Sequence, residues 1–187
     1  SILYEKVVAM REQLNQLHDD VDAFIVRLGA LRKDEIASKE TLHALKLQLI
    51  ESRRKLQKSN LPGIPLEFLT ILEDGEEILS EVSAKLDAKP LEMHAIKQLL
   101  KEATEKINLV LEKTDEMVES AILTEQLIQY GNRYRSQYPR ISEELNRAET
   151  YFRSYNYSEA IEIAASAIYQ IDKSVVKKFQ VEIEEIS

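Results

Sequence analysis

Residues 3–56 read LYEKVVAMREQLNQLHDDVDAFIVRLGALRKDEIASKETLHALKLQLIESRRKL. Positions at spacings that alternate between four and three residues form a seam, and thirteen of its sixteen members are apolar. The seam comprises Leu3, Val7, Met10, Leu14, Leu17, Val21, Phe24, Leu28, Leu31, Glu35, Ser38, Leu42, Leu45, Leu49, Ser52 and Leu56. A repeat of about 3.5 residues held in one phase is typical of a helix that faces other helices in a coiled coil or long bundle.

This seam predicts one helix of more than fifty residues. No proline interrupts it, and Gly29 costs only about 1 kcal/mol in a helix interior. At ~1.5 Å per residue the helix would be about 80 Å long, which is too long for a compact domain of this size. We therefore expect a rod, with the remaining chain packed along the first helix.

The composition fits long helices with solvated charged faces and excludes several functions. The 187 residues are 44% hydrophobic and 31% charged, with four glycines, four prolines and no tryptophan. A net charge of −8 argues against nucleic-acid binding, which needs basic surface. Without cysteine there is no disulfide or thiolate chemistry, and a reducing, intracellular setting is favoured. No apolar run is long enough to span a membrane.

Two further helices are expected after the first. The proline-containing turn at residues 60–65 precedes a second helix over about 65–88, and a third helix follows over about 90–137, where Pro139 stops it. Helices of these lengths joined by short turns predict an all-α, antiparallel three-helix bundle. The first helix would project from one end and the third from the other, which is the geometry of spectrin-like repeats.

We expect three parts along the chain. Residues 1–30 would be the truncated end helix of a preceding spectrin-like repeat, because the heptads begin at residue 3 without a capping signal, as in a fragment of a longer protein. Residues 31–120 would form a spectrin-like three-helix bundle. Residues 121–187 would form a small C-terminal helical bundle.

The C-terminal part has a different sequence pattern from the long heptad helices. Residues 148–168, AETYFRSYNYSEAIEIAASAI, resemble one tetratricopeptide-type unit, but a peptide groove needs stacked neighbours. The alternative is a small helical cap that closes the end of the rod. Residues 173–187 either form a last short helix, which would use Val176, Phe179, Ile183 and Ile186, or trail from it.

Residues with catalytic or metal-binding potential are scarce. His18 and Asp22 are one helical turn apart, but zinc sites need three or four ligands, and the other two histidines lie far away in sequence. No glycine-rich phosphate loop and no nucleophile beside a base can be identified. We expect no enzyme activity, no cofactor and no metal.

One segment departs from its surroundings. Residues 126–142 contain no Asp or Glu, although the chain has 33 of them. The segment carries three arginines, Arg133, Arg135 and Arg140, and three tyrosines at four-residue spacing, Tyr130, Tyr134 and Tyr138. At about 100° per residue the tyrosines share one side of a helix with Leu123 and Leu127, and this side should pack on the C-terminal helices.

The other side of that helix would be an exposed stripe of amides and arginine. It comprises Gln126, Gln129, Arg133, Ser136 and Gln137, with Asn132 beside it. Because such groups offer directional hydrogen bonds and arginine is frequent in binding hot spots, the stripe predicts a partner-binding surface. The alternative is that the arginines pair with acids of neighbouring helices such as Glu143, Glu144 or Glu149, since exposed ion pairs are common and weak.

Three stretches carry a family resemblance: SNLPGIP at 59–65, TEQLIQYGNRYRSQYP at 124–139 and LNRAETYFRSYNYSEAIEIAASAI at 145–168. Together they resemble the C-terminal part of the septation ring formation regulator family EzrA. The resemblance implies a rod of spectrin-like repeats at the cytoplasmic face of the cell membrane and the division septum, carried on an N-terminal membrane anchor that this chain lacks.

The resemblance also implies a function and a site. It implies negative regulation of ring assembly by the tubulin-like protein FtsZ. The family's Gln, Asn and Arg patch, tied to midcell localisation, maps onto Gln126, Gln129, Asn132, Arg133 and Arg135. The tyrosines would support this patch by packing beneath it.

Two functional hypotheses follow. The first is a non-catalytic cell-division scaffold that binds FtsZ and other division proteins and reaches the membrane only through its anchor. The alternative is a generic coiled-coil or spectrin-like spacer, or a self-association rod, without a specific ligand surface. In that case the seam over residues 3–31 would be a homo-dimer interface.

Overall fold

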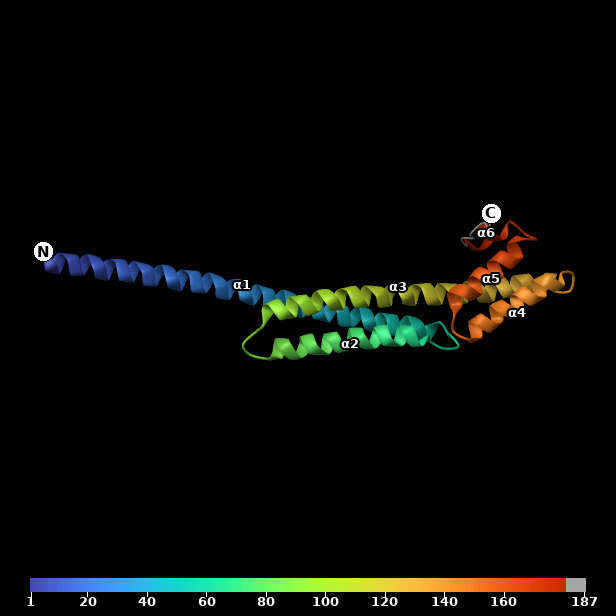
Figure 1. Ribbon diagram of the computed structural model, residues 1–187, viewed down its shortest axis with the longest axis horizontal. Coiled ribbons are helices and arrows are strands. Elements are labelled where there is room, and N and C mark those ends of the chain that lie inside the picture. The colour runs from blue at the N-terminus through green and yellow to red at the C-terminus, as the bar shows by residue number, and fades with distance from the viewer. Residues whose placement is uncertain (181–187) are drawn as a thin grey trace.

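The computed structural model describes residues 1–180 and has an elongated, all-α shape (Figure 1), which confirms the expected fold class. Its helices in chain order are α1 (Ile2–Lys58), α2 (Leu66–Asp87), α3 (Met93–Gly131), the 3₁₀ turn η1 (Asn132–Tyr134), α4 (Pro139–Arg153), α5 (Tyr157–Tyr169) and α6 (Val175–Phe179). Within the described residues, no helix combines the length and the hydrophobicity that crossing a bilayer requires.

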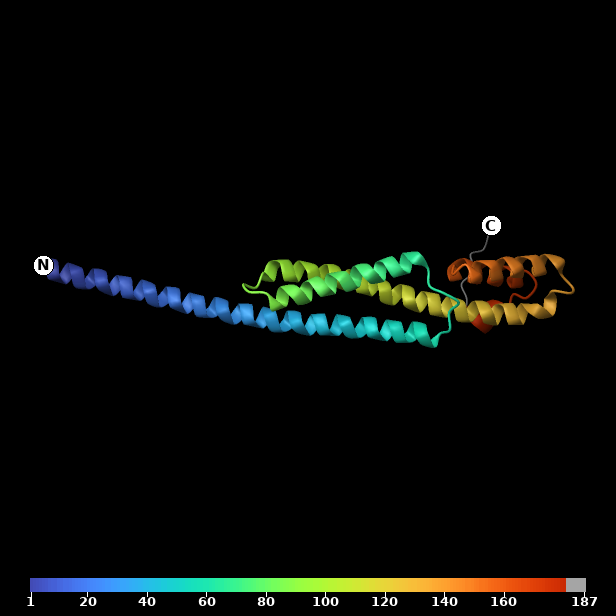
Figure 2. The same cartoon turned by 90° about the horizontal axis from the view of Figure 1, so that it is seen from below.

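Helix α1 is one unbroken helix of 57 residues, as the seam predicted. Its first turn is capped by Ser1, whose hydroxyl accepts the N–H of Tyr4 at 3.3 Å, so the statement that a capping signal is missing was wrong. The N-terminal half of α1 extends away from the other helices (Figures 1 and 2), and every residue from 1 to 33 is exposed. The same seam is therefore solvent-exposed over residues 3–31 and buried further on.

The C-terminal part of α1 packs with α2 and most of α3 in a three-helix bundle (Figure 2). Its core contains Leu42, Leu45, Leu49, Leu56, Phe68, Leu79, Val82, Leu86, Met93, Ile96, Leu100, Ala103, Ile107, Val110 and Val118. Two of the polar seam positions, Ser38 and Ser52, are also buried, whereas Glu35 is half-buried and accepts a hydrogen bond from Lys39 at 3.0 Å. Ala88 is extended before Lys89 and Pro90, which ends α2 where expected.

The last turns of α3 pack with α4 and α5 at the far end of the rod (Figure 2). This second core contains Leu127, Ile141, Leu145, Ala148, Ala164, Ala165, Ala167, Ile168 and Val175. The α4–α5 hairpin packs on the end of α3, which agrees with the cap interpretation of this segment. The division of the chain into parts at residues 30 and 120 stays a prediction.

Helix α3 ends at Gly131, six residues before the predicted end near residue 137. The prediction assumed that Pro139 stops α3, but this proline starts α4 at its first turn. Because α4 packs back on α3, the chain must reverse before Pro139, and residues 132–138 form that reversal. Gly131 makes close packing possible, because a Cβ atom here would lie 2.8 Å from Leu145 Cδ1 and 3.0 Å from Ile168 Cδ1.

The predicted last helix is only partly described. Helix α6 ends at Phe179, and Gln180 follows in the left-handed region with φ 52°. The expected core positions Ile183 and Ile186 lie outside the described residues.

Candidate partner-binding surface

The five residues of the predicted patch lie where α3 turns into α4, at the end of the rod opposite the α1 arm (Figure 1). Gln126 and Gln129 are exposed on the last turns of α3, and Asn132 and Arg133 are exposed in η1. Arg135 follows η1 and is half-buried. The fold thus places four of the five side chains in solvent, and the fifth lies deeper.

Arg135 is held by three hydrogen bonds. Its Nε donates to Asn132 Oδ1 at 2.8 Å, one terminal nitrogen donates to Asn146 Oδ1 at 2.8 Å, and the other to Glu149 Oε1 at 2.5 Å. The side chain is 24% exposed. Of the acids considered as alternative partners, Glu149 therefore does pair with an arginine of this segment. This arginine fastens the reversal to α4 and also holds the Asn132 side chain.

Arg133 has different surroundings. Its Nε donates to the backbone carbonyl of Tyr130 at 3.1 Å, and its guanidinium carbon lies 4.2 Å from the centroid of the Tyr130 ring. No acid within residues 1–180 forms an ion pair with it. A cation stacked on an aromatic face keeps a defined orientation, and its two terminal nitrogens make no hydrogen bond to any described residue.

Two of the three tyrosines pack against the second core beside the patch. Tyr130 and Tyr134 are half-buried against the second core, and their ring centroids are 6.0 Å apart in an edge-on arrangement. The centroid of Phe179 of α6 lies 5.5 Å from that of Tyr130. The Tyr138 ring lies beside that of Tyr134, with centroids 6.5 Å apart, but Tyr138 is in the reversal and 45% exposed, so the prediction that it packs on the C-terminal helices was wrong. That prediction assumed a helix as far as residue 137.

A polar network surrounds the Tyr130 hydroxyl. This hydroxyl donates to Asp172, and Lys178 Nζ donates to the hydroxyl at 2.9 Å. Hydrogen bonds to Asp172 from the Ser174 hydroxyl and from Tyr130 lower the pKa of this carboxyl to about 2. The hydrogen bond with Tyr130 raises the pKa of Lys178. The network ties the end of α3 to the chain after α5, and sequence reasoning missed it because its members are 42 and 48 residues apart.

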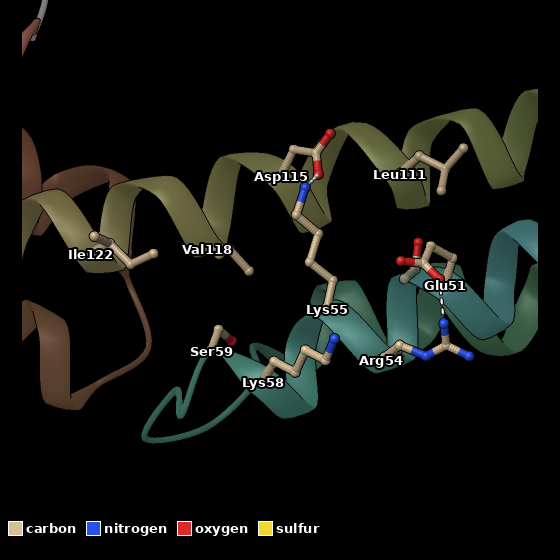
Figure 3. Close-up of a pocket in the computed structure, with 10 residues that line it drawn as sticks. Glu51, Arg54, Lys55, Lys58, Ser59, Leu111, Asp115, Val118 and Ile122 are labelled. Atoms are coloured by element: carbon tan, nitrogen blue, oxygen red, sulfur yellow. Dashed lines mark hydrogen bonds and ion pairs between the residues drawn. The ribbon is translucent and has the colours of Figure 1, made fainter.

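A second surface feature is a groove between the end of α1 and α3 (Figure 3). Its lining residues are Glu51, Ser52, Arg54, Lys55, Lys58, Ser59, Leu111, Asp115, Val118 and Ile122. Lys55 of α1 crosses the groove to form an ion pair with Asp115 of α3 (Figure 3). The Ser52 hydroxyl is buried here and has no hydrogen-bond partner among the described residues. The groove is lined by both acids and bases, and the serine in the seam was the only indication of it in the sequence.

The histidine and aspartate considered as metal ligands lie on the exposed arm. His18 Nε2 and Asp22 Oδ2 are 3.4 Å apart, with both side chains more than half exposed. Among the residues that the structure describes, no group of three or more His, Asp or Glu side chains is placed to hold a metal ion.

An elongated helical rod with an exposed heptad arm defines the class of coiled-coil-like helical-bundle proteins. Comparison with known sequences gives the family: the family model described as "Septation ring formation regulator, EzrA" matches residues 1–183. The chain therefore belongs to the EzrA family of septation ring formation regulators, which confirms the resemblance in its sequence motifs.

Individual relatives agree with this assignment. A septation ring formation regulator EzrA from Bacillus pumilus is 38% identical over 176 residues, which are 90% of this chain and 31% of the relative. Proteins of the same name from a Geobacillus species and from Listeria welshimeri are 39% and 35% identical, over 78% and 85% of this chain and 26% and 28% of the relatives. The chain spans less than a third of the length of these curated relatives. No solved structure matches the chain significantly.

Proposed function

We propose that this chain is part of a non-catalytic cell-division scaffold that negatively regulates FtsZ ring assembly. Membership of the septation ring formation regulators supports the cell-division role. A long rod supports a steric and tethering mechanism. A membrane anchor elsewhere in the longer protein would hold the rod at the cytoplasmic face of the septum, and the patch would dock FtsZ or another division protein.

The observation that carries the docking role is the arrangement of Arg133. This side chain lies at the tip of the rod, is stacked on Tyr130, and has no acidic partner among the described residues. Gln126, Gln129 and Asn132 are exposed around it and add directional donors and acceptors. A pre-oriented arginine loses less side-chain freedom on binding than a free one, which favours a hot spot.

Arg135 has another role in this proposal. Its hydrogen bond to Asn132 Oδ1 orients the Asn132 amide, and its contacts with α4 hold the reversal that presents the patch. We therefore assign direct partner contact to Gln126, Gln129, Asn132 and Arg133, and a positioning role to Arg135.

The test is fluorescence anisotropy of the labelled chain with purified FtsZ at moderate salt. A variant with Asn132→Ala and Arg133→Glu is compared with a matched charge reversal, Lys46→Glu, at an exposed position on α1. Loss of a hot-spot arginine costs about 2 kcal/mol or more, which is about 30-fold in Kd. We expect that weakening for the patch variant and unchanged binding for Lys46→Glu.

Two results would count against the proposal. Equal binding by the patch variant and the wild type would remove the docking role from these residues. No binding by the wild type would mean that this part of the protein is a spacer, with FtsZ contact in other parts of the longer protein.

The competing function is self-association through the arm. Nine consecutive seam positions from Leu3 to Leu31 are exposed, and exposed heptads of this length form coiled-coil dimers in other proteins. Sedimentation of the chain over a hundredfold concentration range separates the two functions. A tight dimer that Leu17→Asp dissociates would support an assembly role for the seam.

A further inference from the structure

The middle of α3 joins the two cores and differs from the rest of the helix. Between the last large side chain of the first core, Val118, and the first of the second core, Leu127, its buried positions are small or hydroxylated: Ser120, Ala121 and Thr124. Thr124 donates its hydroxyl hydrogen to the Ser120 carbonyl four residues earlier, at 2.6 Å. Hydroxyl groups that bond to the preceding turn bend helices slightly. Thr104 and Thr114 of α3 make the same kind of bond, so this stretch differs from the rest of the helix in having no large buried side chain from either core.

A second connection runs beside α3. The hydroxyl of Tyr157, the first residue of α5, donates to the Gly63 carbonyl at 2.6 Å and accepts the Gly63 N–H at 3.4 Å. Gly63 lies in the loop between α1 and α2, so these bonds join the three-helix bundle to the C-terminal helices. Tyr157 is only 2% exposed, and its ring packs edge-on against Phe152 of α4 with centroids 5.3 Å apart. The hydroxyl is thus fixed in position by its own helical hairpin.

Tyr155 presses on the same glycine. A Cβ atom on Gly63 would overlap Cζ of the Tyr155 ring, so only glycine allows the loop and the ring to come this close. Tyr155 has φ 67°, in the left-handed region, and follows the end of α4, where the Asn156 N–H bonds to the Tyr151 carbonyl at 2.9 Å. Glycine is the residue that usually occupies this position, because a side chain is disfavoured there. A tyrosine in this conformation points to a role for its ring.

A third contact lies next to these two. The Ser158 hydroxyl donates to Glu116 Oε1 of α3 at 3.0 Å. The start of α5 is therefore attached both to the loop before α2 and to α3 itself.

We propose that Tyr155, Tyr157 and Gly63 form a clamp that fixes the angle between the three-helix bundle and the C-terminal bundle. A single helix through the joint would leave bending and twisting about residues 118–124 of α3 free. The clamp adds a second attachment beside α3, so both motions require breaking the Tyr157 hydrogen bonds and lifting the Tyr155 ring from Gly63. The clamp thereby sets the direction in which the end of the rod faces relative to the α1 arm.

The test measures the width of a distance distribution across the joint. The chain has no native cysteine, so spin labels at Glu77→Cys on α2 and Glu143→Cys on α4, both exposed positions, report on the angle by double electron–electron resonance. Tyr157→Phe keeps the ring and removes the hydroxyl. Tyr155→Gly removes the ring and relieves the left-handed conformation, so it loosens the clamp without destabilising the end of α4.

We expect a narrow distribution for the wild type and at least a twofold increase in width for each variant. The matched control is Tyr169→Phe in α5, since the Tyr169 hydroxyl makes no hydrogen bond to any described residue, and its distribution should stay narrow. Far-ultraviolet circular dichroism confirms that helix content is unchanged. If Tyr157→Phe loses helix content, two other variants test the clamp: Tyr155→Gly, and Gly63→Ala, which displaces the Tyr155 ring.

A distribution as narrow in the folded variants as in the wild type would overturn the clamp. A wild-type distribution that is already broad would also overturn it, because the joint would then be flexible with the clamp in place.

Discussion

Replacing Arg135 by alanine removes three hydrogen bonds, of which two join the reversal after α3 to α4 and one holds Asn132 within the reversal. A hydrogen bond to a charged group contributes about 1.5–3 kcal/mol when it is well buried. The side chains of Arg135 and Glu149 are 24% and 30% exposed, so water screens their pair and replaces part of the loss. Arg153 also remains 3.6 Å from the Glu149 carboxylate. We therefore expect a loss of about 1–2 kcal/mol in the free energy of unfolding.

Urea unfolding followed by circular dichroism at 222 nm measures this loss. The matched control is Arg147→Ala, because Arg147 pairs with Glu144 within α4 and is 57% exposed. Exposed pairs of this kind contribute about 0.5 kcal/mol or less. Arg133→Ala loses an exposed stacking contact with Tyr130 and should lower stability by about 0.5–1 kcal/mol, less than Arg135→Ala. In thermal unfolding the Arg135 variant should melt about 2–8 °C lower.

The reasoning would be refuted by one pattern of results. If Arg135→Ala were as stable as Arg147→Ala, Arg135 would be an ordinary surface side chain. The assignment of a positioning role to Arg135, in contrast to the direct-contact role of the other four patch residues, would then be wrong.

Other positions give equally direct tests. Gly131→Ala places a methyl group against the second core, and overpacking of this kind should lower the free energy of unfolding by about 1–2 kcal/mol in the same urea experiment. Ser52→Ala removes a buried hydroxyl that has no hydrogen-bond partner within residues 1–180 and should raise the free energy of unfolding by about 1 kcal/mol, whereas a decrease would reveal an unrecognised partner. Asp172 has a folded-state pKa lowered to about 2, so its stabilising effect is complete above the unfolded-state pKa near 4 and disappears as the pH falls through about 2. The stability difference between wild type and Asp172→Asn should therefore shrink over that range, and a difference that is independent of pH would contradict the assignment.

Helical periodicity was sufficient to predict α1, because only a continuous helix keeps an apolar seam in constant phase over more than fifty residues. It was not sufficient to predict which part of the seam is buried. Leu14 and Leu28 follow the same spacing as Leu45 and Leu49, yet the first two are exposed and the last two are buried in the bundle. Burial depends on whether other helices lie alongside, and local spacing carries no information on that.

The end of α3 was mispredicted for a related reason. Proline both ends helices and begins them, and the sequence alone did not distinguish these roles at Pro139. The helical wheel was therefore extended through residues that form a reversal, which misplaced Tyr138 relative to the second core. Exposure of Gln126 and Gln129 was predicted correctly, because these residues still lie on α3.

Contacts distant in sequence could not be predicted. Tyr157 and Gly63 are 94 residues apart. Gly63 lies in a proline-containing loop and Tyr157 is the first residue of α5, and local sequence accounts for each without reference to the other. Only the packing of α5 beside the loop before α2 brings the hydroxyl to the glycine carbonyl.

Because α3 belongs to both hydrophobic cores, the three-helix bundle and the C-terminal bundle share one structural element and should depend on each other for stability. The helix has 39 residues, and neither core is complete without its part of it. Unfolding of the C-terminal core would leave the last turns of α3 without side-chain support, and unfolding of the first core would remove most of the helix on which α4 and α5 dock. The rod should therefore resemble a linear array in which each segment is stabilised by its neighbour. In amide hydrogen exchange, protection should fall outward along α3 from each core rather than change abruptly at a boundary between independent domains.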